Sequence, residues 1–155
     1  MEIKELENYN ATEPIKDIFL EYAQFLEVDL CFQGFEQELA DLKKLYAPPS
    51  GCILIAIEGE TLAGTVALKK IGEGVCEMKR LYVRPDFQKR GLGKELVQLL
   101  ITKAKEKNYT LMRLDTLDKL QPAIMLYKSL GFVETTAYYH NPLPNVVYME
   151  LQLAI

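Results

Sequence analysis

Apolar residues at the start of the chain recur at the spacing of amphipathic helices. One helical face is predicted between positions 12 and 28, formed by Ile15, Ile18, Phe19, Tyr22, Phe25 and Leu26. Thr12 is placed to cap this helix, and Pro14 suits its first turn. A short strand at Ile3–Leu6 precedes it. A second helical stripe ends at the prolines after position 47, and consists of Phe35, Leu39, Leu42 and Leu45.

The middle of the chain has the pattern of strands separated by turn residues. Three strands are predicted in succession, at Cys52–Ile57, Leu62–Lys69 and Val75–Val83. The turns between them contain Gly59 and Gly72. Because connections this short join antiparallel neighbours, we expect the three strands to form an antiparallel unit.

The last third of the chain alternates between helices and strands. Helices are predicted at 93–107 and 121–130, and strands at 111–117, 132–138 and 146–153. A strand, a helix and a further strand form a unit with a parallel strand pair. The pattern therefore predicts an α/β fold with a mixed, mostly antiparallel sheet of six to seven strands flanked by about four helices. We expect residues 1–155 to form a single domain.

Composition narrows the functional classes. The chain has 155 residues and a net charge of −4, so no general basic surface favours nucleic acid. No stretch approaches the ~20 apolar residues that span a bilayer, and the first residues lack the apolar run of a signal peptide. We therefore expect a cytoplasmic protein without a membrane partner. Three separated cysteines and one histidine make a metal site unexpected.

The loop Gln88–Lys94 follows a predicted strand and precedes a predicted helix. Backbone N–H groups at a helix start are unpaired and lie at the positive end of the helix dipole, and glycines let a phosphate approach closely. Lys89, Arg90 and Lys94 add positive charge. A P-loop is excluded by Gln88 and Glu95, and a dinucleotide fingerprint by Leu96. The loop predicts a pyrophosphate site, and the alternative is a solvated turn that merely caps the helix.

This segment resembles the GCN5-related N-acetyltransferase (GNAT) superfamily. The signature Gln/Arg-x-x-Gly-x-Gly/Ala is matched by Gln88, Gly91 and Gly93. Two later landmarks of the family follow in the same order, at 114–116 and 123–132. The resemblance covers residues 52–153 well, whereas residues 1–50 match loosely because that region varies with the substrate in the family.

The resemblance implies a sheet that opens beside its fourth strand and binds acetyl-CoA as co-substrate. Backbone groups of Leu81, Tyr82 and Val83 would hold the pantetheine arm. The pyrophosphate would be bound by the loop residues Gln88, Lys89, Arg90, Gly91, Leu92, Gly93 and Lys94. Many relatives have an asparagine on the coenzyme arm where this chain has Leu120, so that contact is lost or is made by Gln121.

Acetyl transfer needs a base for the amine, donors for the oxyanion and an acid for the thiolate. The resemblance places Tyr127 at the sulfur as general acid, and the alternative is a core tyrosine. Glu77 is the candidate base, and the alternative is a surface glutamate paired with a lysine. Simple alternation puts Glu77 on one face with Lys79, Leu81 and Val83, unless a bulge changes the parity.

The acceptor site is predicted from loops that follow the first helix and the sixth strand. The candidates are Phe32, Gln33, Phe35, Tyr138, Tyr139 and His140, with Arg80 and Arg84 for a carboxylate on the acceptor. Aromatic rings can hold a cation, but such rings also serve as packing, and the arginines could form a solvated face. We expect an N-acetyltransferase that acts on a small-molecule amine, as a monomer or homodimer. The alternatives are protein N-terminal or lysine acetylation, or a non-catalytic acyl-CoA sensor.

Overall fold

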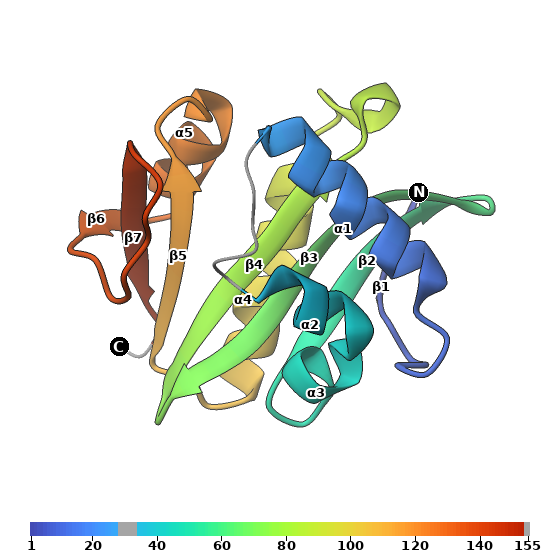
Figure 1. Ribbon diagram of the computed structural model, residues 1–155, viewed down its shortest axis with the longest axis horizontal. Helices are drawn as coiled ribbons and strands as arrows, with labels where there is room; N and C mark the ends of the chain where they lie inside the picture. The colour runs from blue at the N-terminus through green and yellow to red at the C-terminus, as the bar shows by residue number, and fades with distance from the viewer. Residues whose placement is uncertain (28–33, 154–155) are drawn as a thin grey trace.

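The structure, a computed structural model, describes residues 1–27 and 34–153 (Figure 1). Seven strands in this part of the chain form one sheet in the order β1-β2-β3-β4-β5-β7-β6. Their bounds are β1 (Glu2–Glu5), β2 (Cys52–Glu58), β3 (Thr61–Gly72), β4 (Val75–Val83), β5 (Leu111–Leu117), β6 (Val133–Thr135) and β7 (Val146–Gln152). The helices are α1 (Glu13–Leu26), α2 (Phe35–Ala40), α3 (Leu42–Tyr46), the 3-10 turn η2 (Pro85–Phe87), α4 (Leu92–Glu106) and α5 (Gln121–Ser129).

The sheet is mixed and mostly antiparallel, so the predicted fold class is confirmed. Among the strand pairs of the described chain, only β4 and β5 run parallel, and they are joined through α4 as expected. Helices cover both faces, with α1, α2 and α3 on the front of the sheet and α4 behind it (Figure 1).

The central strands bury side chains on both faces. Along β2, Cys52 and Leu54 belong to the core on the α4 side, whereas Ile53 and Ile55 belong to the core on the α1 side. All four side chains are at most 7% exposed. This double burial explains why the segment is a continuous apolar run rather than an alternating one.

The parallel pairing between β4 and β5 is short. It covers Val75↔Leu111, Cys76↔Met112 and Glu77↔Arg113, and no further pair follows. Beyond Glu77 the two strands separate, which Figure 1 shows as a widening gap between the ribbons. Backbone groups of the second half of β4 that face β5 are therefore not used in the sheet.

A bulge in β4 changes which face its side chains occupy. Arg80 has a φ of 60°, and the register with β3 shifts at the same place. An extra residue reverses the side-chain directions that follow it. Leu81 and Val83 consequently pack on the α4 side, opposite to Glu77 and Lys79. Simple alternation would put all four on one face, and it does not hold here because the strand contains a bulge, the case in which we expect the parity to change.

Three further details differ from the sequence predictions. The predicted second helix is two helices, because Asp41 leaves the helical conformation with a φ of −146° and caps α3 by accepting a bond from the Lys44 N–H at 3.1 Å. Thr12 stands at the start of α1 without a side-chain cap. The closing strand β6 ends at Thr135, so Tyr138 lies in a loop.

Candidate active site

A cavity of about 680 Å³ follows the gap between β4 and β5. It is lined by the end of β4, by the loop and helix start at 87–94, and by Tyr127 of α5. Asp115 of β5 also lines it. We call this cavity the groove, because it runs from the predicted pyrophosphate loop to the predicted general acid.

The loop at the groove's end has the geometry of an anion site. Gly91 is the N-cap of α4 with a φ of 76°, a conformation that glycine adopts without strain. A Cβ atom on Gly91 would meet nothing within 4 Å, so the backbone here is open. The Gln88 side chain donates from Nε2 to the Val83 carbonyl at 2.9 Å and ties the loop to the end of β4.

The basic side chains of the loop divide into two groups. Lys89 and Lys94 line the groove. Arg90 does not, because its guanidinium pairs with Glu58 at 3.5 Å and lies over the Phe87 ring at 5.3 Å. The positive charge that this loop brings to the groove therefore comes from the two lysines.

Tyr127 is 6% exposed and lines the groove from α5. Its ring packs against Phe132 with centroids 5.7 Å apart. Burial raises the pKa of the Tyr127 phenol well above its usual value, so the hydroxyl stays protonated. Leu120 and Pro122 line the groove nearby, whereas the Gln121 side chain donates back to the Asp118 carbonyl.

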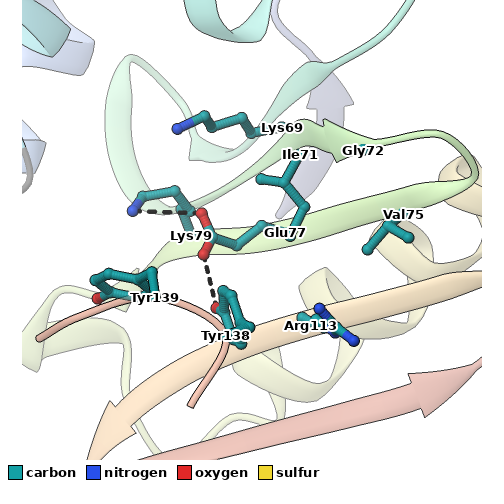
Figure 2. Close-up of a pocket in the computed structure, with 9 residues that line it drawn as sticks. All are labelled: Lys69, Ile71, Gly72, Val75, Glu77, Lys79, Arg113, Tyr138 and Tyr139. Carbon is teal, nitrogen blue, oxygen red and sulfur yellow. Dashed lines mark hydrogen bonds and ion pairs between the residues drawn. The ribbon is translucent and has the colours of Figure 1, made fainter.

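A second cavity of about 500 Å³ is lined by Glu77 (Figure 2). We call it the polar cavity, and its lining consists of Lys69, Ile71, Gly72, Val75, Glu77, Lys79, Arg113, Tyr138 and Tyr139. Lys79 lines both the polar cavity and the groove. The two cavities therefore adjoin at this residue.

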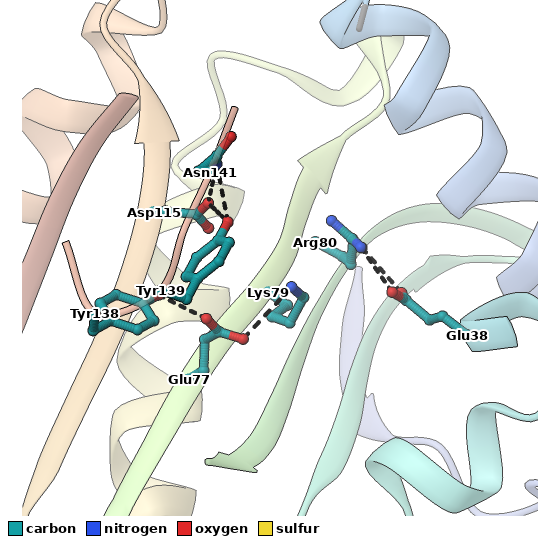
Figure 3. A network of polar contacts seen from close by, with 8 residues as sticks. All are labelled: Glu38, Glu77, Lys79, Arg80, Asp115, Tyr138, Tyr139 and Asn141. Carbon is teal, nitrogen blue, oxygen red and sulfur yellow. Dashed lines mark hydrogen bonds and ion pairs between the residues drawn. The ribbon is translucent and has the colours of Figure 1, made fainter. Parts of the chain in front are cut away.

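Glu77 is 4% exposed, so it is not the surface glutamate of the alternative interpretation. Its Oε2 accepts a bond of 2.6 Å from the Tyr138 hydroxyl, and its Oε1 lies 3.5 Å from Lys79 Nζ (Figures 2 and 3). Burial lowers the pKa of the Lys79 ammonium, and the charge of Glu77 opposes that shift. The lysine separation exceeds a normal hydrogen bond, so this contact is an ion pair.

Asp115 forms a second carboxylate cluster that sequence reasoning missed (Figure 3). It accepts bonds from the Tyr139 hydroxyl and, at 3.2 Å, from Asn141 Nδ2. The Tyr138 and Tyr139 rings pack together at 5.4 Å. Their loop is thus fastened to β4 through Glu77 and to β5 through Asp115, and it forms a wall of the site.

The predicted acceptor residues are only partly brought together. Tyr138 and Tyr139 line the polar cavity, whereas His140 is exposed and lines neither cavity. Phe35 is buried beneath Arg80, with the guanidinium 5.2 Å from the ring centroid. Phe32 and Gln33 lie outside the described residues.

The two predicted arginines have partners inside the protein. Arg80 forms a two-bond pair with Glu38, at 3.0 Å and 2.7 Å (Figure 3). Both side chains are at most 4% exposed, so Arg80 is not on a solvated face. Arg84 donates to the Leu62 carbonyl at 2.8 Å and pairs with Glu21 at 3.3 Å. Both guanidinium groups are therefore paired within the protein, and Arg80 also lines the groove.

The buried thiols and acidic groups do not form a metal centre in the described part of the chain. Within residues 1–27 and 34–153, no three histidine, cysteine, aspartate or glutamate side chains are grouped to bind a metal ion. Burial raises the pKa of both Cys52 and Cys76 to about 12, which keeps these thiols neutral. None of the helices in the same residues has the length and apolar character needed to span a bilayer.

Comparison with known proteins identifies the class of protein. Residues 13–132 match the Acetyltransferase (GNAT) family. An uncharacterized N-acetyltransferase of Schizosaccharomyces pombe is 48% identical over 90% of this chain and 86% of its own length. One from Dictyostelium discoideum is 32% identical over 99% of this chain and 100% of its own. The chain therefore belongs to the GNAT family and is an acetyl-CoA-dependent N-acetyltransferase.

Solved structures show the same fold. A Streptococcus agalactiae acetyltransferase superposes with a TM-score of 0.80 at 23% identity, over 97% of each chain. A Salmonella typhimurium structure that contains its cofactor acetyl-CoA superposes with a TM-score of 0.75 at 20% identity, over 100% of this chain and 95% of its own.

The Arg80–Glu38 pair yields a stability prediction. Replacing Glu38 by alanine leaves a buried guanidinium without its partner, which costs about 3–5 kcal/mol. We expect Glu38→Ala to lower the free energy of unfolding by that amount in urea denaturation. Glu36→Ala on the same helix removes an exposed carboxylate and serves as control. Equal stability of the two variants would contradict a structural role for the pair.

Proposed function

We propose that the chain transfers the acetyl group of acetyl-CoA to the primary amine of a small metabolite, with residues 1–155 acting as one domain. The observation that carries this proposal is the end of β4–β5 pairing beside a groove that leads from the Gly91 loop to Tyr127. The adjoining polar cavity, about 500 Å³, suits a small acceptor better than an extended peptide.

The donor binds along the groove. Backbone groups of Leu81, Tyr82 and Val83 have no partner strand in β5, so they can pair with the amides of a pantetheine arm. Leu92 is the first residue of α4, so the unpaired N–H groups of this helix start face the pyrophosphate. Lys89 and Lys94 add charge on the same side.

The acceptor amine approaches from the polar cavity. Glu77 takes its proton, directly or through a water molecule, at the oxygen that faces Lys79. The neutral amine attacks the thioester carbonyl, and the oxyanion is stabilised by a backbone N–H near Leu81. Collapse of this intermediate breaks the carbon–sulfur bond, and the nitrogen releases its second proton to water as the neutral amide forms.

Tyr127 then protonates the leaving thiolate. Burial raises the pKa of this phenol, and the same desolvation raises the proton affinity of a thiolate formed beside it. The proton affinities of the phenolate and the thiolate therefore rise together, which supports transfer of the proton between them. Coenzyme A leaves as the neutral thiol, and the amide leaves through the polar cavity.

Removing the phenolic hydroxyl of Tyr127 tests the role of this residue as general acid. We expect Tyr127→Phe to lower kcat about 100-fold with little change in the affinity for CoA, measured by thiol release and by calorimetry. Tyr109→Phe, which removes another buried hydroxyl bonded to the Ser50 carbonyl, should leave kcat near the wild-type value. An unchanged kcat in Tyr127→Phe would remove this residue from the mechanism.

The base is tested with an isosteric amide. Glu77→Gln keeps an acceptor for the Tyr138 hydroxyl but cannot take a proton at neutral pH, so we expect kcat to fall about 100-fold. The affinity for CoA should stay the same. Glu73→Gln, in the exposed turn after β3, controls for the loss of one negative charge. Full activity of Glu77→Gln would assign the proton to another group.

A bulky, negatively charged side chain in the pyrophosphate loop tests the proposed site for the acetyl donor. We expect Gly91→Glu to raise the Kd for CoA by at least about tenfold through steric and charge conflict. Gly59→Glu is a matched control, because Gly59 also has positive φ, at 63°, and open space around its Cβ position. Similar CoA affinity in both variants would refute this placement of the pyrophosphate.

A further inference from the structure

One cation in the polar cavity lacks a carboxylate partner among residues 1–27 and 34–153. Three basic side chains line the cavity, and two of them are neutralised within the protein. Lys79 pairs with Glu77 at 3.5 Å, and Arg113 Nε lies 3.4 Å from Glu150. Lys69 forms no ion pair with the residues that the structure describes. The cavity therefore carries one excess positive charge.

The position of Lys69 makes this unpaired charge unexpected. Lys69 lies directly opposite Glu77 in the β3–β4 register, where side chains of opposite charge are within reach of each other. Glu77 instead contacts Tyr138 and Lys79. Figure 2 shows the side chains of Lys69 and Lys79 extending in the same direction, with neither Glu77 oxygen joined to Lys69.

The rest of the cavity restricts what could neutralise Lys69. The Tyr138 hydroxyl already donates to Glu77, and Ile71 and Val75 give the wall an apolar part. Lys69 itself is partly buried, so its charge is less screened than on an open surface. A small molecule with an anionic group and a short apolar segment complements this lining.

We propose that the polar cavity binds an acceptor carrying both a primary amine and a carboxylate, with the carboxylate at Lys69 and the amine at Glu77. Lys69 is then the residue that selects the acceptor. Cross-strand neighbours have Cβ atoms about 5 Å apart, so both ends of one amino acid can reach their partners. The proposal rests on the proposed function, because it names the acceptor class for the same transfer.

Paired acceptors test the selectivity. Each ω-amino acid of two to five carbons is compared with the alkylamine of the same length, since the amine is similar and only the carboxylate differs. We expect wild-type kcat/KM to favour the better amino acids by at least about tenfold. Lys69→Gln should abolish this preference by raising KM for the amino acids, and Lys69→Arg should retain most of it.

The neighbouring lysine supplies a matched control. Lys70 is exposed, pairs with Glu73 at 3.1 Å and does not line the polar cavity. Lys70→Gln removes the same charge from the same strand and should keep the wild-type preference. Equal loss of preference in Lys69→Gln and Lys70→Gln, or a wild type that accepts alkylamines equally well, would overturn the proposal while leaving acetyl transfer intact.

A binding measurement separates this site from catalysis. Butyrate carries the carboxylate without an amine, and calorimetry in the presence of CoA measures its Kd. We expect Lys69→Gln, but not Lys70→Gln, to weaken butyrate binding by about tenfold or more. If butyrate binding depends on Lys69 but no amine is acetylated, the carboxylate site is supported and acetyl transfer to small amines is contradicted. An equal Kd for butyrate in the wild type and in Lys69→Gln would refute the carboxylate site.

Discussion

The point at which β4 stops pairing with β5 is the constraint on which the rest of the site depends. A strand in the middle of a sheet normally uses its backbone groups on both edges. Here the parallel ladder ends after Glu77↔Arg113, and the freed edge borders the groove. The two strands continue apart, and the groove and the polar cavity share Lys79 in their linings.

The bulge at Arg80 sets the faces that the β4 side chains occupy, and the Arg80–Glu38 pair holds α2 against this strand. The bulge directs Leu81 and Val83 to the α4 core, and it leaves Glu77 and Lys79 on the face that carries α2. A buried guanidinium is costly unless it is paired. The Glu38 carboxylate on α2 accepts two hydrogen bonds from it. The N-terminal helix α2 is thereby anchored to the strand that carries the proposed base.

Local features were predictable from sequence, and contacts between distant segments were not. The Gln88–Lys94 loop is predicted as an anion site because its glycines and charges lie close together in the sequence, between a strand and a helix. Glu77 and Tyr138 are 61 residues apart, so nothing local indicates their bond. A positive φ at Arg80 has no sequence signal either, so alternation alone does not fix the face at the end of β4.

The donor and acceptor halves of the site differ in what determines them. In the proposed function, acetyl-CoA contacts backbone groups of β4 and a helix start along the groove, which many sequences can provide in the same fold. The polar cavity is lined largely by charged and aromatic side chains, including Lys69, Glu77, Lys79 and Tyr138. Substitution of such side chains changes charge without changing the sheet. In our proposal, acceptor preference therefore follows from the charge balance of this cavity, in which Lys69 is the residue without an internal counterion among those described.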